Sequence, residues 1–177
     1  SLGEMYRQLT PGGIRVPDGF AVTADAFRHF LEANGLHRPL TALMGQLDRK
    51  TFSNLQSTGA SARALLLDAA MPDDLAADIR QAYRQLAGDD KQVSFAVRSS
   101  ATAEDLPNAS FAGQHETYLN VQGEEGVVQA VQRCFASLFT DRAIKYREDN
   151  GFAHMQVALS VGVQRMVRSD LACAGIA

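Results

Sequence analysis

The stretch "SFAVRSSATAEDLPNASFAGQHETYLNV", residues 94–121, decides how this chain folds. Its first part alternates with a period of two, so Phe95 and Val97 fall on one face and Arg98 shares the other face with small residues. Small, polar and turn-forming residues follow, and a second apolar strand pattern begins at Thr117. The pattern predicts a strand, a loop and a second strand, with Arg98 on a face that leaves room for a ligand.

The same stretch offers the chemistry of an anion site. Phosphate recognition needs a fixed cation, backbone N–H donors and residues small enough to let the anion approach the backbone. Arg98 supplies a forked cation, and Gly113 permits backbone conformations closed to other residues. There is no G-x-x-x-x-G-K-[ST] or G-x-G-x-x-G pattern. An ordinary hairpin connection with Arg98 in a weak surface ion pair therefore stays open as the alternative.

Helical periodicity dominates the first half of the chain, and strand periodicity appears after it. Helices are predicted over residues 1–9, 24–35, 36–47, 51–70 and 72–88, with Thr23 as an N-cap and an extended stretch over 14–23. Strands are predicted over 92–97, 117–123 and 156–167, with an amphipathic helix after the second strand. Asp141 and Arg142 are expected to cap and open a further helix. The pattern favours an α+β (α/β-like) layered fold, helical first and then mainly antiparallel sheet with helices.

Composition narrows the class of protein. The 177 residues are 46% hydrophobic and 21% charged with a net charge of -3, which predicts one globular folding unit and no nucleic-acid binding. No apolar run is long enough to span a membrane, and the start "SLGEMYRQLT" lacks a signal-peptide core, so we expect a cytoplasmic protein. Cys134 and Cys173 are expected to be buried free thiols. The four histidines show no metal-ligand spacing.

The central stretch, together with "SLFTDRAIKYR" and "VALSVGVQRMVRSD", resembles the nucleotide-binding domain of the phosphoenolpyruvate synthase (pyruvate, water dikinase) family. Pyruvate phosphate dikinase and rifampicin phosphotransferase have related domains. The resemblance runs through essentially the whole chain and implies the first lobe of an ATP-grasp domain, with residues 1–90 mainly helical and 91–177 strand-rich. It implies that ATP passes its β-phosphoryl group to a histidine on another domain and then to pyruvate, giving phosphoenolpyruvate, AMP and phosphate.

The resemblance also assigns roles to residues. Arg98 would contact the ATP phosphates as the catalytic cation, a loop from Gly113 to Thr117 would cover them, and the end of the last strand would line the adenine pocket. His115 stands where the family usually has Gln, and Glu104 and Asp105 are interpreted as solvated or capping acids. The nucleotide-binding set is Arg98, Gly113, Gln114, His115, Glu116, Thr117, Gln164, Met166 and Val167.

Other parts of the family's machinery are expected outside this sequence. They are a Gly-Gly-Lys before Ser1, the acidic Mg²⁺ ligands after Ala177, the phosphohistidine domain and the pyruvate barrel. We therefore expect a fragment that is inactive alone and binds ATP weakly. Its expected partners are ATP and the phosphohistidine domain of the same full-length enzyme, with no nucleic acid or membrane, and a homodimer stays open. Two other readings remain: the ATP-binding domain of a rifampicin phosphotransferase, and a non-catalytic interaction module.

Overall fold

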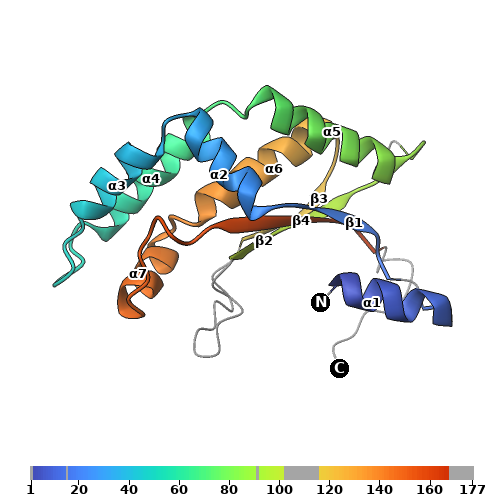
Figure 1. Ribbon diagram of the computed structural model, residues 1–177, viewed down its shortest axis with the longest axis horizontal. Helices are drawn as coiled ribbons and strands as arrows, with labels where there is room; N and C mark the ends of the chain where they lie inside the picture. The colour runs from blue at the N-terminus through green and yellow to red at the C-terminus, as the bar shows by residue number, and fades with distance from the viewer. Residues whose placement is uncertain (1, 15, 91, 102–115, 168–177) are drawn as a thin grey trace.

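The computed structural model describes residues 2–14, 16–90, 92–101 and 116–167, and these residues form a sheet with helices around it (Figure 1). The sheet has four strands in the order β1-β4-β2-β3, and the three neighbouring pairs are antiparallel. The strands are β1 (Gly19–Val22), β2 (Phe95–Ala101), β3 (Thr117–Val121) and β4 (Leu159–Arg165). The predicted α+β class is confirmed, as is the antiparallel pairing of the two strands that flank the central loop.

The helices fall mainly in the first half of the chain, as predicted. They are α1 (Leu2–Leu9), η1 (Thr10–Gly12), α2 (Ala24–Ala33), α3 (His37–Gly45), α4 (Leu55–Asp68), α5 (Asp73–Ala87), α6 (Glu124–Ser137) and α7 (Asp141–Asp149). The extended stretch at 14–23 contributes β1, which crosses to pair with β4 at the far end of the sequence. Among the described helices, none is long and apolar enough to span a bilayer.

Threonine side chains cap two of these helices. The Thr23 hydroxyl accepts a hydrogen bond from the Ala26 N–H at 3.4 Å, which confirms the predicted N-cap of α2. At α7 the cap is Thr140, whose backbone is extended and whose hydroxyl accepts from the Ala143 N–H at 3.3 Å. The expectation that Asp141 caps this helix is wrong. Asp141 is the first helical residue and pairs instead with Arg63 at 3.2 Å.

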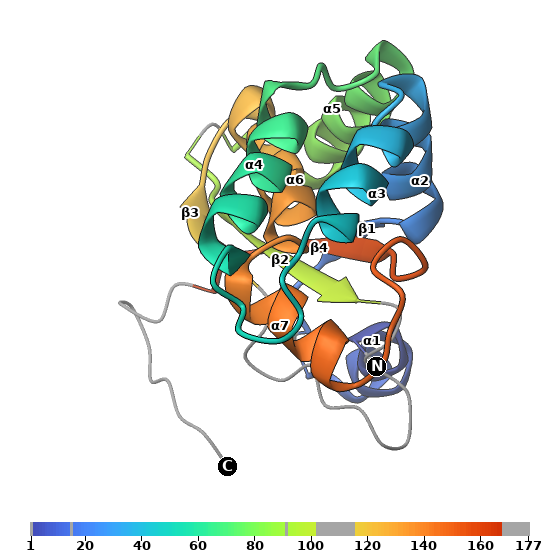
Figure 2. The same cartoon turned by 90° about the vertical axis from the view of Figure 1, so that its left-hand side faces the viewer.

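The core lies between the sheet and one layer of helices. Figures 1 and 2 show α2, α4, α5 and α6 on one side of the sheet, and α1 on the opposite side. Phe95 and Val97 of β2 are fully buried under this layer, and Phe135 of α6 packs edge-to-face on Phe27 of α2 with 5.1 Å between ring centroids. Burying a side chain of this size contributes about 1.5–3 kcal/mol. The period of two in β2 therefore fixes which face of the sheet receives the helices.

The edge strand β3 is irregular. Phe95 pairs with Val121 and Val97 with Tyr118, so Leu119 and Asn120 together lie opposite the single residue Ala96. This is a β-bulge, and Asn120 takes a left-handed backbone with φ of 56°. The side chain of Leu119 is 59% exposed. The bulge bends the strand that leads out of the central loop.

Gly19 of β1 lies close to the backbone of β4. A Cβ at this position would lie 2.4 Å from the Val163 carbonyl oxygen, so the β1–β4 pair would have to move to admit it. We expect Gly19→Ala to lower the free energy of unfolding by about 1–3 kcal/mol. Chemical denaturation measures this, and Gly162→Ala on β4 is the matched control, because its Cβ would lie 3.9 Å from the Arg98 carbonyl oxygen. Equal stability of the two variants would contradict the prediction.

Candidate functional site

The sheet face turned away from the main helix layer carries the candidate site, and we call it the open face. In an antiparallel pair, residues directly opposite one another project to the same face. Arg98 lies opposite both Thr117 of β3 and Gly162 of β4, so it stands in the middle of the sheet. The residues of the open face are Gly19, Ala21, Ala96, Arg98, Ser100, Thr117, Ser160, Gly162 and Gln164.

Small side chains surround Arg98 on the open face. Arg98 is exposed, whereas its neighbour Val97 is fully buried on the other face, as the alternation predicted. Gly162 beside it has no side chain, and the Ser160 hydroxyl donates to the Ser100 carbonyl at 3.2 Å. None of the acidic side chains in the described ranges forms an ion pair with Arg98. The surface-ion-pair alternative therefore has no support in that part of the chain.

Two of the predicted loop residues reach the open face or its margin. Thr117 is exposed directly opposite Arg98, a position in which the two Cβ atoms of a strand pair are about 4.5–5.5 Å apart. The Glu116 carbonyl accepts from the Ser99 N–H at 3.2 Å and from the Ser99 hydroxyl at 3.3 Å. The start of β3 is thereby fixed beside β2. Gly113, Gln114 and His115, like Glu104 and Asp105, lie outside the described residues.

The residues expected at the adenine pocket lie at the C-terminal end of β4 and just after it. Gln164 is on the open face opposite Ala96, a diagonal neighbour of Arg98 at about 7–8 Å between backbones, and its Nε2 donates to the Pro17 carbonyl at 3.2 Å. The Met166 N–H donates to the Ser94 carbonyl at 2.9 Å, so that donor is already used within the fold. Val167 is 62% exposed. Base recognition through the backbone here would have to use groups other than the Met166 N–H.

Sequence reasoning missed the contribution of β1 to this face. Gly19 and Ala21 lie opposite Gln164 and Gly162, and both are exposed. The available signal was local: Gly19 and Ala21 alternate with Phe20 and Val22, which is the same small-and-bulky alternation seen in β4. That short pattern predicts a strand but does not indicate that the strand pairs with residues 161–164.

The open face suits a ligand that is anionic and can lie against a sheet. It combines one central guanidinium, the Thr117 hydroxyl, and backbone that small residues leave uncovered. Within the described ranges, no group of three or more His, Cys, Asp and Glu side chains is placed to hold a metal ion. This part of the chain defines a sheet-and-helix domain whose open face carries one exposed arginine among small residues.

Comparison with known proteins identifies the family of this chain. Residues 1–177 match the family described as pyruvate phosphate dikinase, AMP/ATP-binding domain, and the chain belongs to this family. It is 53% identical over 176 residues to the phosphoenolpyruvate synthase of Escherichia coli strain K12, and 54% identical over 182 residues to that of a Synechocystis strain. It is 50% identical over 178 residues to the phosphoenolpyruvate synthase of Aquifex aeolicus.

The match covers nearly all of this chain and a small part of each relative. The three alignments include 99% of this chain, but only 22%, 22% and 21% of the respective relatives. The resemblance to the phosphoenolpyruvate synthase family that the motifs predicted is therefore confirmed for a segment of about a fifth of such an enzyme.

Proposed function

We propose that this chain is the ATP-binding first lobe of a phosphoenolpyruvate synthase (pyruvate, water dikinase), built as the first half of an ATP-grasp domain. The observation that carries the proposal is the position of Arg98, exposed at the centre of the open face among small residues. Membership of the AMP/ATP-binding family and about 50% identity to several phosphoenolpyruvate synthases support it.

In this proposal the open face holds ATP. Arg98 binds the phosphates with a charge-assisted fork and stabilises the negative charge that moves as the phosphoryl group is transferred. Thr117 adds a hydroxyl donor beside it, and the loop from Gly113 to Thr117 would cover the phosphates. Gln164, Met166 and Val167 border the adenine. The small residues matter because a side chain at any of those places would hold the nucleotide away from Arg98.

The remaining chemistry of the proposal belongs to the longer enzyme. ATP would give its two terminal phosphoryl groups to a histidine on a separate domain as a pyrophosphoryl group, leaving AMP. Water would then release the γ-phosphoryl group as phosphate, and the histidine would pass the β-phosphoryl group to pyruvate. Mg²⁺ would neutralise the phosphates, held by residues outside 1–177. A cytoplasmic location and a role in gluconeogenesis are parts of the same proposal.

The identity of the phosphoryl acceptor tests this function. The full-length protein is incubated with ATP labelled in the β-phosphate and with either pyruvate or rifampicin, and the products are separated. We expect label in phosphoenolpyruvate and none on rifampicin. Label on rifampicin would replace this proposal with the antibiotic-modifying one, and the absence of transfer to either acceptor would reject both.

The isolated chain is predicted to bind ATP poorly. The open face leaves the nucleotide exposed on the side opposite the sheet, and in an ATP-grasp domain a second lobe closes that side. We expect a Kd of about 1 mM or weaker, equivalent to about -4 kcal/mol, by isothermal titration of residues 1–177. A Kd in the low micromolar range would contradict the need for a second lobe.

A further inference from the structure

Ser99 of β2 is a polar residue at a core position. It shares the helix side of the sheet with Phe95 and Val97, lies directly opposite the fully buried Val161 of β4, and is itself buried. An apolar side chain would fill this position without a hydrogen-bond partner, whereas a buried hydroxyl needs one. Core packing therefore does not explain why a hydroxyl is present here.

The Ser99 hydroxyl has its partner on the chain that enters β3. Its Oγ donates to the Glu116 carbonyl at 3.3 Å, and the Ser99 N–H donates to the same carbonyl at 3.2 Å. A carbonyl oxygen has two lone pairs, so this one residue of β2 can engage both of them. The hydroxyl adds a second tie to a backbone contact that the sheet already makes.

The tie is placed where the chain joins the proposed ATP site. Glu116 is the first described residue after the central loop, and Thr117, which follows it, lies opposite Arg98. The pairing of β2 with β4 continues past this point as far as Ala101. Ser99 therefore fixes the start of β3 against a part of β2 that β4 holds from the other side.

We propose that Ser99 is a positioning residue of the ATP site: its hydroxyl fixes the Glu116 peptide and so holds the Thr117 hydroxyl beside Arg98. This inference rests on the proposed function, in which Arg98 and Thr117 bind the phosphates. Ser99 itself faces the helix layer and does not contact the nucleotide. Binding groups need support of this kind, because a site is effective only when the residues behind it lock its geometry.

A double-mutant cycle on the full-length protein tests this role. The measurement is the Kd for the α,β-methylene analogue of ATP, in which a carbon bridge prevents transfer of the pyrophosphoryl group. Thr117→Ala should raise this Kd about tenfold or more, because it removes a hydrogen bond to a charged group. Ser99→Ala should raise it about 3- to 10-fold, as for the loss of a hydrogen bond between neutral groups.

The double variant decides whether Ser99 acts through Thr117. It should bind the analogue as weakly as Thr117→Ala alone, because the contact that Ser99 supports is then already missing. A Ser99→Ala effect that persists undiminished in the Thr117→Ala background would overturn the proposal, as would wild-type affinity in Ser99→Ala. Ser99→Thr keeps the hydroxyl and should restore binding.

Ser137→Ala is the matched control for stability. Ser137 of α6 is also buried, and its hydroxyl also donates to a backbone carbonyl, that of Cys134 at 2.7 Å. This variant should lower the midpoint of chemical denaturation about as much as Ser99→Ala does, yet bind the analogue like the wild type. An equal loss of affinity in both variants would reduce the role of Ser99 to stability. If Ser99→Ala does not fold, Ser99→Cys replaces it, since a thiol is a weaker donor and should also raise the Kd.

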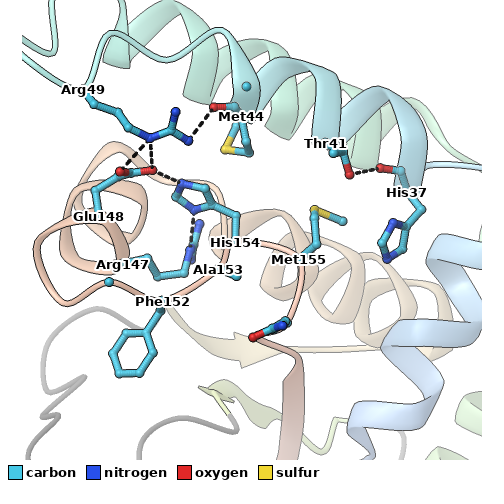
Figure 3. A pocket seen from close by; sticks show the side chains of 13 residues that line it. His37, Thr41, Met44, Arg49, Arg147, Glu148, Phe152, Ala153, His154 and Met155 are labelled. Atoms are coloured by element: carbon cyan, nitrogen blue, oxygen red, sulfur yellow. Dashed lines mark hydrogen bonds and ion pairs between the residues drawn. The ribbon is translucent and has the colours of Figure 1, made fainter.

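A second control lies beside the cavity between α3 and residues 151–156, which none of the open-face residues lines. Figure 3 shows the polar cluster there: Arg49 Nε donates to both Glu148 oxygens at 3.0 and 3.1 Å, and Glu148 Oε1 lies 2.7 Å from His154 Nε2. The buried Arg147 donates through Nε to His154 Nδ1 at 2.9 Å. Arg49→Ala should disturb this cluster and leave the Kd for the analogue unchanged.

Arg98→Ala separates failure of this inference from failure of the proposed function. If Arg98→Ala and Thr117→Ala weaken binding of the analogue and Ser99→Ala does not, Ser99 is not a positioning residue and the open face remains the ATP site. If none of the three variants changes the Kd, the nucleotide lies elsewhere and both proposals are rejected.

Discussion

Replacing Arg98 by Ala in the full-length protein is expected to lower the rate of ATP-dependent phosphorylation of the acceptor histidine by about 10²–10³-fold. The reason is the position of Arg98 in the proposed complex, where no neighbour on the open face offers a second cation: Thr117 and Gly162 lie directly opposite it, and Gln164 is its diagonal neighbour. The side chain is exposed and lies outside the core, so the loss should fall on catalysis while the fold persists.

The matched control is Arg84→Ala. Arg84 is also exposed, but it lies on α5 and pairs with Glu124 of α6 at 2.8 Å on the helix side of the sheet. We expect this variant to phosphorylate at the wild-type rate. The measurement is the single-turnover rate of label transfer from ATP to the protein. Unchanged transfer in Arg98→Ala would reject the ATP-binding role of the open face and favour the interaction-module interpretation.

Gly162→Leu should weaken ATP binding by about 10- to 100-fold while leaving the fold intact. A Cβ at this position would meet only the Arg98 carbonyl oxygen within 4 Å, at 3.9 Å, and the backbone of Gly162 is not among those with positive φ. The longer side chain would project from the open face beside Arg98, into the space proposed for the phosphates. Overpacking of about 1.4–2.8 kcal/mol corresponds to about 10- to 100-fold weaker binding.

Two measurements separate this obstruction from damage to the fold. The Kd for ATP of the full-length protein should rise, while its free energy of unfolding should change by less than about 0.5 kcal/mol, as for a surface substitution. Gly45→Leu is the control. Gly45 is an exposed residue of α3, no atom lies within 4 Å of a Cβ added to it, and it is not one of the open-face residues. A Gly162→Leu protein with wild-type affinity would show that the nucleotide lies elsewhere.

Local patterns were sufficient to predict most of the fold. The alternation at 94–98 placed Phe95 and Val97 in the core and Arg98 on the other face, and the Thr23 cap was predicted from its residue type and position. These features depend on neighbours a few residues away. The cap of α7 was misassigned because Thr140 and Asp141 are both good capping residues, and the choice between them depends on which one has an extended backbone.

Long-range pairing was not accessible in the same way. No pattern in the sequence indicates that residues 19–22 pair with residues 161–164. The small residues of β1 were therefore absent from the predicted site. The adenine-edge prediction named Gln164, which lies on the open face, but it could not show that the Met166 N–H donates to the Ser94 carbonyl. The buried guanidinium of Arg147 was also not predicted, because burial of a cation opposes the residue's usual preference.

The bulge in β3 has a consequence for solubility. A straight terminal strand displays a row of free peptide groups onto which a second molecule can add its own strand, and many sheet proteins aggregate in this way. The left-handed residue Asn120 interrupts that row and twists the outer margin of the sheet away from a regular partner. We therefore expect the bulge to disfavour addition of a strand from a second copy along β3, the strand that places Thr117 beside Arg98.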